Sequence, residues 1–523
     1  MDALIAVAIV LPLLLAAMLL HPGSRVVALK FAPMAALPTL FMATYWLFTG
    51  VPLAALDLPW LLLGSRFELD GTGGLFLFFS ALVWALAGWY ARGYMREDLR
   101  KHVFWSFFLA SQAGNLGVCL AADAVSFYLL FALMTFAAYG LVIHSGRAAA
   151  RHAAKVYLIM AVIGEVALVA GMLLAVHAAG SHRFIDLVAA PWSMPAALLL
   201  IGGFAIKTGT PLLHMWLPLA HPVAPTPASA VLSGLMLKAG LLGWLRFLPL
   251  GAHALPESGL TLAAAGLLAI FFGVVLGLMQ RDAKALLAYS SISQMGFMTL
   301  AVGVGLRYPA LWPALWPAVG LYALHHALAK SALFLGVGIV RAQGVSTRVL
   351  AGLALPALAV AGAPFSGGML AKVALKAGLY DLPPVWVTLL PWLLALAAIG
   401  STLLMARLLW LCSRTFSASG GAGLVVPWSV LLLALVIAPI VLAPAEIRSS
   451  LINREALIAA VWPLLFGLSL AALAIHRRWR GPSIPPGDVL ISLERLNRLL
   501  SMLIKRIAGT FLPYNRRLKI RIK

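Results

Sequence analysis

The chain has 523 residues, of which 63% are hydrophobic and 10% are charged, and this composition excludes a water-soluble globular domain. The formal net charge of +22 does not indicate nucleic-acid binding, because the basic residues lie in short loops and in the C-terminal tail. The two cysteines, Cys119 and Cys412, provide neither a disulfide framework nor a metal-ligand spacing. We therefore expect an all-α membrane protein surrounded by a lipid bilayer, with no metal site and no nucleic-acid partner.

Apolar segments of spanning length follow one another from the N-terminus to residue 475. A transmembrane helix needs about 20 predominantly apolar residues, and we expect 14–15 such helices. The approximate ranges are 3–20, 32–49, 72–90, 103–120, 124–144, 156–177, 194–212, 229–247, 259–279, 286–304, 318–340, 350–378, 385–409, 425–443 and 457–475. The first range follows Asp2 rather than a basic stretch and lacks a small-residue cleavage site, so we interpret it as a retained span.

Lysine and arginine are concentrated in alternate loops. One set of loops contains residues 92–101, 147–155 and the pair Arg281 and Lys284. In the opposite set, basic residues are sparse and mostly accompanied by acids. An excess of lysine and arginine marks cytoplasmic loops. The protein is therefore expected in the cell (inner) membrane, with its N-terminus outside and its C-terminus in the cytoplasm.

Two of the expected spans are interrupted. Residues 207–227 contain five prolines, which is too many for one continuous helix. Residues 362–368 read Gly-Ala-Pro-Phe-Ser-Gly-Gly and divide the twelfth span. Two broken helices at corresponding positions of two halves indicate inverted repeats around a site in the middle of the membrane.

These signals divide the chain into five parts. The division places N-terminal helices at 1–102, a first inverted five-helix repeat at 103–247, a second at 259–409, C-terminal helices at 410–476 and a basic cytoplasmic tail at 477–523. Leucines and basic residues occupy different faces of a helical pattern within that tail. A basic amphipathic helix of this kind lies on a membrane surface or packs on a partner subunit. The alternative is a loosely ordered basic tail.

Several ionisable side chains lie within the expected spans: Glu165, Lys207, Lys238, His325, His326, Lys330 and Lys372. A lysine at the centre of a spanning helix costs roughly 2.5–3.5 kcal/mol on insertion scales. Such residues usually mark an ion path, so the set indicates an ion-moving membrane protein. The alternative for any single lysine is that its span is displaced and its side chain extends to the membrane interface.

Four sequence blocks resemble a known family. They are KTGTPLLHMWLPLAHPVAPTPASAVLSGLMLKAGLLGWLR at 207–246, RDAKALLAYSSISQMGFM at 281–298, YALHHALAKSALFLG at 322–336 and PFSGGMLAK at 364–372. Their order and spacing resemble the antiporter-like subunits of respiratory complex I and their relatives in membrane-bound hydrogenases, formate-hydrogenlyase-type complexes and Mrp antiporters. The resemblance covers about residues 60–410, and the stretch His-Pro-Val-Ala-Pro-Thr-Pro is most similar to the hydrogenase-type branch.

The resemblance implies proton translocation along a polar axis in the membrane, driven by other membrane and peripheral subunits of a larger complex. It assigns proton-carrying roles to Glu165, Lys207, Lys238, His326, Lys330 and Lys372. His326 and Lys330 are four residues apart and therefore share a helix face, although such a pair can also be a structural cluster. His325 and Lys376 are secondary candidates, because His325 has a structural alternative and Lys376 can extend to the interface.

Two positions depart from the family pattern. The glutamate expected in the fifth span is replaced by Ala132, and the earlier histidine of the eleventh span by Tyr322. Either Glu165 takes over as the counter-charge of Lys207, or the first half-channel is altered or silent.

Three functions remain open. The first is a proton-translocating subunit of a quinone-oxidoreductase- or hydrogenase-type complex, without cofactors or redox chemistry of its own, since no cofactor motif is present. The second is the membrane subunit of an inorganic-carbon (CO2/bicarbonate) pump that consumes an ion gradient together with a soluble zinc protein. The third is a non-conducting structural subunit. The sequence does not distinguish H⁺ from Na⁺, and it does not give the direction of transport.

Overall fold

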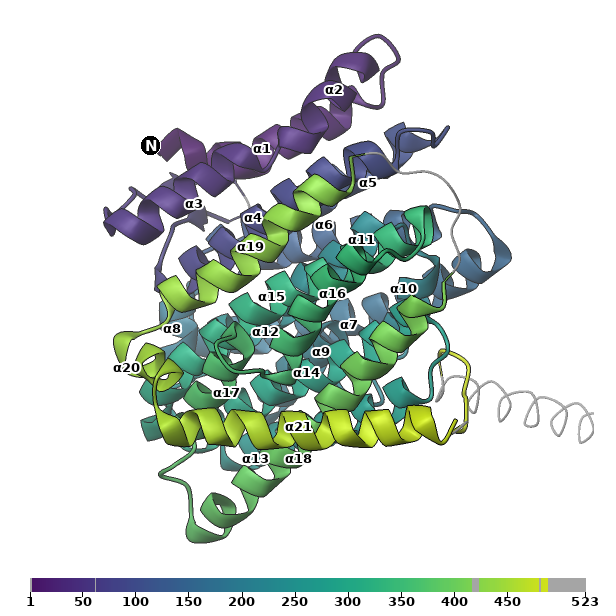
Figure 1. Cartoon of the computed structure of the whole chain (residues 1–523). Coiled ribbons are helices and arrows are strands. Elements are labelled where there is room, and N and C mark those ends of the chain that lie inside the picture. Colours follow the sequence, from purple (N-terminus) through teal and green to yellow (C-terminus); the bar gives the residue numbers. More distant parts are fainter. Residues whose placement is uncertain (1, 62, 416–422, 479–480, 488–523) are drawn as a thin grey trace, which may run out of the picture.

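Long apolar helices lie side by side in the computed structural model, which describes residues 2–61, 63–415, 423–478 and 481–487 (Figure 1). Twelve helical segments of this part are long and apolar enough to cross a membrane. Three shorter apolar helices, Leu4–Met18, Met194–Thr208 and Thr347–Ala361, lie at three further expected positions. The expectation of an all-α protein with 14–15 membrane helices is therefore confirmed, with three of them shorter than a full span.

The first half of the chain contains the helices before and after the first break. Their bounds are α1 (Asp2–Met18), α2 (Arg25–Phe31), α3 (Leu37–Thr49), α4 (Gly71–Tyr94), α5 (Lys101–Leu120), α6 (Ala124–Ile143), α7 (Ala148–Ala179), α8 (Phe184–Ala189), α9 (Met194–Thr208), α10 (Trp216–Val223), α11 (Thr226–Val231) and α12 (Leu237–Phe247). A π-helical turn, Leu232–Met236, joins α11 to α12. A short hairpin pairs β1 (Leu56–Leu58) with β2 (Ser65–Phe67) in antiparallel register, with Asp57 opposite Arg66.

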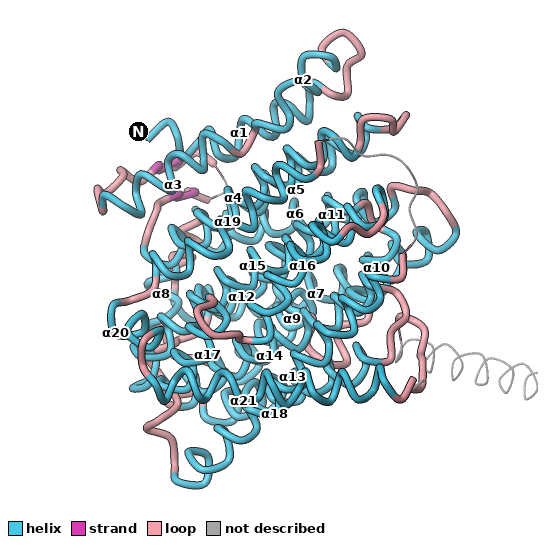
Figure 2. Tube along the Cα trace, viewed as in Figure 1, coloured by secondary structure: helices cyan, strands magenta, loops and turns pink. Residues whose placement is uncertain are grey.

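The second half of the chain also consists of helices joined by loops (Figure 2). Its helices are α13 (Pro256–Leu278), α14 (Ala283–Arg307), α15 (Trp312–Gln343), α16 (Thr347–Ala361), α17 (Gly367–Gly378), α18 (Pro384–Ser413), α19 (Val425–Leu442), α20 (Ala445–Arg448) and α21 (Arg454–His476). Short 3₁₀ turns at Ala32–Met34, Pro309–Leu311 and Ser449–Leu451 complete the helical elements of the described residues.

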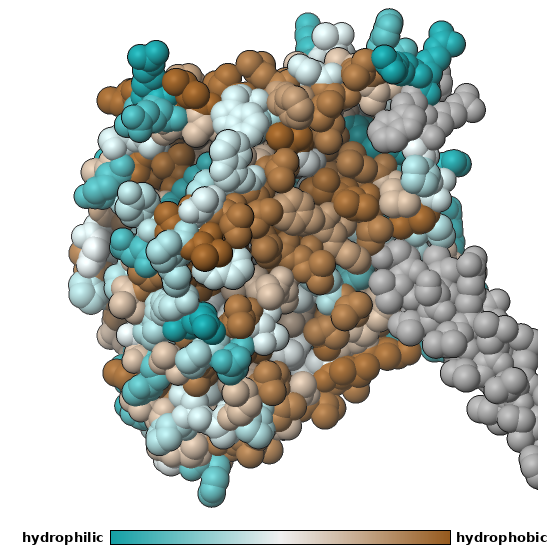
Figure 3. Space-filling model, turned by 90° about the horizontal axis from the view of Figure 1, so that it is seen from below, coloured by the Kyte–Doolittle hydropathy of each residue, from teal (hydrophilic) through white to brown (hydrophobic). Residues whose placement is uncertain are grey.

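Burial separates the central helices from the outer ones. In α14 and α15 all residues of the most apolar stretch are buried, whereas in α21 only 17% are. The outward face of α21 carries large exposed apolar side chains, including Trp462, Leu465 and Phe466. Figure 3 shows one outer face of the molecule, with hydrophobic side chains over a broad area of it. Such a surface is stable in lipid but not in water, and it leaves α14 and α15 to hold polar groups away from the bilayer.

Both expected helix breaks are present, and their backbones are alike. The helix α9 ends before Gly209 and α16 ends before Gly362, and both glycines have a positive φ, of 77° and 92°. Three residues after each glycine, a bulky residue also adopts a positive φ, Leu212 at 71° and Phe365 at 62°. A non-glycine residue in this region stores roughly 1–3 kcal/mol of strain. The two breaks are therefore built from the same backbone pattern at corresponding positions.

An ion pair joins Asp70, which precedes the spanning helix α4, to Arg246 in the last turn of α12. Asp70 caps α4 by accepting a hydrogen bond from the Gly73 N–H at 2.6 Å, and it also accepts one from Arg246 Nη2 at 2.9 Å. Burial by itself would raise the pKa of Asp70, but the positive charge of Arg246 and the hydrogen bonds to the carboxylate lower the pKa below its ordinary value.

The amphipathic helix expected in the tail lies outside the described residues. The segment before it, 481–487, is described and contacts the end of α13 and the helix α10. The Ile484 N–H donates a hydrogen bond to the Met279 carbonyl at 3.3 Å, and Gly487 packs on the Leu219 side chain of α10.

Candidate functional site: a buried polar axis

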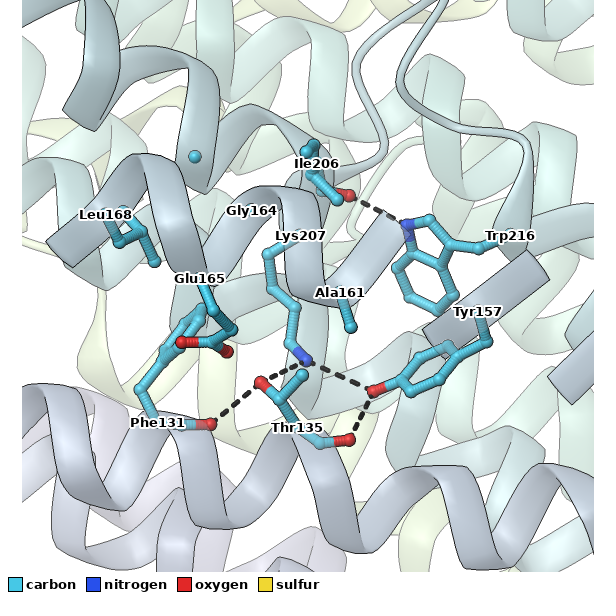
Figure 4. Close-up of a pocket in the computed structure, with 11 residues that line it drawn as sticks. Phe131, Thr135, Tyr157, Ala161, Gly164, Glu165, Leu168, Ile206, Lys207 and Trp216 are labelled. Atoms are coloured by element: carbon cyan, nitrogen blue, oxygen red, sulfur yellow. Dashed lines mark hydrogen bonds between the residues drawn. The ribbon is translucent and has the colours of Figure 1, made fainter. Parts of the chain in front are cut away.

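Lys207 lies in a pocket at the C-terminal end of α9. Its ammonium donates hydrogen bonds to Thr135 Oγ1 at 2.9 Å and to Tyr157 Oη at 3.4 Å (Figure 4). The ring of Phe131 lies 5.3 Å from the ammonium and provides a cation–π contact. The pocket has an empty volume of about 290 Å³. Three helices, α6, α7 and α9, therefore surround a buried cation where the first broken helix ends.

The carboxylate that shares this pocket comes from Glu165 on α7. Its side chain is buried, it acts electrostatically on Lys207, and its Oε2 atom has no hydrogen-bond partner among the described residues. The two groups line one pocket without forming an ion pair within 4.0 Å. Glu165 and Lys207 are therefore brought together, with a separation that a small movement of either side chain would change.

The helix α6 contributes no acid to this pocket. Its lining residues are Phe131 and Thr135, whereas Ala132, the position of the expected glutamate, does not line the pocket. Thr135 supplies a hydroxyl acceptor for Lys207 in place of a carboxylate. A hydroxyl on α6 and the carboxylate of Glu165 on α7 thus occupy the surroundings of Lys207.

Lys238 lies just after the π-helical turn. A π turn leaves backbone groups without their regular α-helical partners, and the Lys238 ammonium donates to one of them, the Ser233 carbonyl, at 2.8 Å. Close approach of this turn to α15 requires Gly234, because a Cβ there would lie 2.1 Å from Ser331 Oγ. No pattern in the sequence indicates the π turn, although Lys238 is expected within a span.

Lys330 lies on α15, where its side chain is fully buried. Its ammonium donates a hydrogen bond to the Leu287 carbonyl of α14 at 3.2 Å. The same carbonyl accepts from Ser291 Oγ at 2.9 Å, and Ser291 Oγ lies 2.7 Å from Ser233 Oγ. Polar groups of Ser233, Ser291 and Leu287 therefore lie between Lys238 and Lys330: the Ser233 carbonyl contacts Lys238, and the Ser233 hydroxyl contacts Ser291.

Among the described residues, Lys238 and Lys330 have no acidic partner within ion-pair distance. The ion pairs of the described residues all lie elsewhere, at Asp57, Glu68, Asp70, Asp98 and Asp282. An unpaired ammonium in a low-dielectric interior is strongly unfavourable. Protonation of Lys238 or Lys330 therefore places an unpaired charge in the protein interior, which is energetically unfavourable.

The two histidines of α15 are buried next to these lysines. His326 experiences the charges of Lys238 and Lys330, and neither of its ring nitrogens has a hydrogen-bond partner among the described residues. His325 is equally buried and unpartnered, but it lies against α17. Gly367 and Gly368 make room for it, since a Cβ on either would lie within 3.3 Å of a His325 ring nitrogen. His326 therefore belongs with the central lysines and His325 with the second broken helix.

Lys372 lies in the second broken helix, beyond the break. Its ammonium donates hydrogen bonds to the carbonyls of Ala361 at 2.7 Å and Val360 at 3.3 Å, at the end of α16. A pocket with an empty volume of about 890 Å³ begins beside it and is also lined by Lys376 and Glu455. Lys376 is half-buried and lines the same pocket as Lys372.

Lys284 was assigned to a loop from the sequence, and this assignment is wrong. It lies in the first turn of α14 and is only 2% exposed. Its ammonium donates to the Ala224 carbonyl at 2.8 Å and to Ser229 Oγ at 3.1 Å. The sequence signal that was overlooked is the position of Lys284 within the block at 281–298, directly before an uninterrupted run of buried residues.

Metal binding has no support in the described residues, where no group of three or more histidine, cysteine, aspartate or glutamate side chains is placed to hold an ion. Both cysteines are buried as free thiols. The ionisable groups of the axis are lysines, histidines and one glutamate.

Comparisons with known proteins identify the family of this chain. The profile of the family described as "NADH:quinone oxidoreductase/Mrp antiporter, TM" matches residues 121–393, slightly more than half of the chain. Hydrogenase-4 component B of Escherichia coli is 32% identical over 52% of this chain and 43% of its own length. The chain spans about half the length of the curated relatives it matches.

Solved structures show the same fold over nearly the whole chain. A chain of the Mrp complex from Dietzia sp. matches with a TM-score of 0.77 and 22% identity, covering 98% of this chain and 60% of that chain. A chain of the membrane-bound sulfane sulfur reductase, an archaeal respiratory membrane complex, matches with a TM-score of 0.72 and 21% identity, covering 98% and 97%. Both structures are multisubunit membrane complexes.

Proposed function

This chain belongs to the NADH:quinone oxidoreductase/Mrp antiporter transmembrane family, and on that premise we propose that it translocates protons as one subunit of a larger energy-converting membrane complex. The axis consists of Glu165, Lys207, Lys238, His326, Lys330 and Lys372, with Lys376 and His325 beside its last member. It is divided between two five-helix repeats, 103–247 and 259–409, and the matching φ pattern of the two breaks supports this division.

The observation that carries this proposal is the set of polar groups between Lys238 and Lys330. The Lys238 ammonium donates to the Ser233 carbonyl and the Lys330 ammonium to the Leu287 carbonyl, while the Ser291 hydroxyl donates to the Leu287 carbonyl and lies 2.7 Å from the Ser233 hydroxyl. The two hydroxyls can pass a proton between them, whereas the carbonyls only accept, so transfer requires the lysine side chains to turn from the carbonyls toward the hydroxyls. Burial opposes the charged form of a lysine. A buried lysine without an acidic partner therefore releases its proton more readily than an exposed one.

Charge movement in the first part of the axis depends on Glu165. When the Glu165 carboxylate moves toward Lys207, it stabilises the ammonium; when it moves away, the ammonium loses this stabilisation and releases its proton. The Oε2 atom of Glu165 has no hydrogen-bond partner among the described residues, and the Thr135 hydroxyl is the side-chain group that hydrogen-bonds the carboxylate, so a movement would have to break only that contact. Glu165 thereby replaces the acid that Ala132 does not provide.

The proposed partners are other membrane and peripheral subunits, which supply the energy. Purification of the tagged protein from its native membrane in mild detergent identifies them by mass spectrometry. Redox subunits with iron–sulfur or nickel–iron centres are the expected result. A single soluble zinc protein would instead indicate the inorganic-carbon pump and overturn the assignment to a redox complex.

Transport itself is tested with the purified complex in sealed vesicles. The driving reaction is started in buffer without Na⁺, and the internal pH is followed with a dye. We expect a proton flux that does not require Na⁺. A flux that appears only with Na⁺ on one side would contradict proton translocation as the primary event.

A further inference from the structure

Lys284 is a buried lysine at one end of the polar axis that the proposed function does not use. Its ammonium bridges the end of α10 and the start of α11 through the Ala224 carbonyl and the Ser229 hydroxyl. Among the described residues, both hydrogen-bond acceptors of this ammonium are uncharged. A side chain that served only to fill space here would not need an ionisable group, whose burial is costly.

The groups around Lys284 come from three other positions. Asp282 lies two residues earlier at the surface, where it caps α14 and forms an ion pair with Arg341 of α15. Both members of this pair are partly exposed, at 34% and 37%. On the inner side, the charges of Lys284 and Lys330 both act on His221 of α10. Lys284 therefore lies between a solvent-accessible carboxylate and a buried imidazole.

His221 has an unusual environment for a buried imidazole. Its ring stacks on Phe334, with 4.5 Å between centroids and 25° between planes, and neither nitrogen has a hydrogen-bond partner among the described residues. An unpartnered buried polar group costs roughly 1–3 kcal/mol. Phe334 follows Lys330 by four residues, so the imidazole faces the same side of α15 as the Lys330 ammonium.

The contacts of Lys284 continue into the connection between the central lysines. On α14, Lys284, Leu287 and Ser291 are spaced three and seven residues apart and share a face. On the opposing segment, Ser229 contacts Lys284 and Ser233, four residues later, contacts Ser291. The two segments thus form a polar seam that begins at Lys284 and ends where Lys238 and Lys330 donate their hydrogen bonds.

We propose that Lys284 is the proton-uptake residue of this axis and that His221 passes its proton to Lys330 and Lys238. This proposal rests on the proposed function. A proton enters from the side of Asp282 and binds the Lys284 amine. The Lys284 ammonium then gives a proton to one nitrogen of His221, which releases a proton from its other nitrogen toward Lys330. Lys284 returns to its neutral form and accepts the next proton from the surface, so charge is conserved at each step.

Lys284→Arg separates a relay from a structural role. Arginine keeps the positive charge and the hydrogen-bond donors but does not release its proton in proteins. We expect the complete complex with Lys284→Arg or Lys284→Met to translocate protons at least about tenfold more slowly in vesicles, as expected for loss of a proton-transfer group. Arg281→Met changes an exposed residue just before α14 and serves as the control with unchanged flux.

His221→Phe provides a second variant that keeps the aromatic stack on Phe334. It is expected to slow proton flux similarly without loss of assembly, measured by the amount of intact complex. Normal flux in both Lys284→Arg and His221→Phe, together with a strong loss in Lys238→Met, would overturn the uptake role and leave the proposed function intact. Normal flux in all three would overturn the proposed function itself. If the Lys284 variants do not assemble, His221→Phe alone decides the outcome.

Discussion

Lys372 donates a hydrogen bond to the carbonyl of Ala361 at 2.7 Å, so the lysine that follows the second break caps the helix that precedes it. The last carbonyls of a helix have no intrahelical partner and carry the negative end of the helix dipole. The contact holds α16 and α17 in a fixed relation across the break. Loss of the Lys372 proton would weaken this electrostatic attraction, so under the proposed function transport would be linked to the geometry of the broken helix.

Lys372→Met is expected to abolish most proton flux and to destabilise the protein. The two carbonyls at the end of α16 would lose their donor, which costs roughly 1–3 kcal/mol when the acceptor is buried. Flux in vesicles and the thermal unfolding midpoint of the purified complex measure the two effects. Lys101→Met, at the first residue of α5, is the control. An unchanged flux with a lowered midpoint would give Lys372 a structural role only.

Glu165→Gln is expected to slow proton flux by about tenfold or more, while the complex assembles normally. Glutamine has the same shape but carries no charge to stabilise the Lys207 ammonium, so the switch between binding and release is lost. Proton flux in vesicles is the measurement, with Glu257→Gln at the start of α13 as the matched control. A flux equal to that of the unmodified protein would mean that the first half-channel is silent.

Gly234→Ala is expected to destabilise the protein by about 1–3 kcal/mol through overpacking. The added Cβ would lie 2.1 Å from Ser331 Oγ and 3.1 Å from the Ala327 carbonyl, so the π-helical turn and α15 would have to separate. Gly202→Ala is the matched control, because a Cβ at this helical glycine has no neighbour within 4 Å. Equal unfolding midpoints for the two variants would contradict the close packing at the π turn.

Asp70→Asn tests the ion pair with Arg246 and its dependence on pH. Asparagine still caps α4, but it leaves the Arg246 guanidinium buried without its carboxylate. Since the pKa of Asp70 is lowered in the folded protein, the pair contributes stability at neutral pH and loses it as the pH falls through this lowered pKa. The unfolding midpoint of Asp70→Asn is therefore expected to lie below that of the unmodified protein at pH 7. The difference should disappear in strong acid; a difference that persists there would contradict the ion-pair explanation.

The sequence predicted the number of membrane helices and both breaks, because these depend on local composition, on prolines and on glycines. It also identified the buried lysines of the axis. It did not predict the Ser233–Ser291 contact, since serine hydroxyls commonly bond within their own helices and only the packing of two segments brings this pair together. Lys284 was misplaced for a related reason. The loop pattern of basic residues predicts that every lysine near the end of a span is exposed. In the structure, the connection between α10 and α11 covers Lys284, whose ammonium donates to the Ala224 carbonyl.

The most direct test of proton translocation along this axis is the flux of the Lys238→Met complex in sealed vesicles, measured beside Lys155→Met, which changes an exposed lysine of α7. Methionine keeps the length and apolar stem of the side chain but removes the proton-binding group and the hydrogen bond to the Ser233 carbonyl. The predicted result is an assembled complex whose proton flux is lost in Lys238→Met and kept in Lys155→Met. Equal flux in the two variants would show that protons do not pass through Lys238 and would contradict the proposed axis.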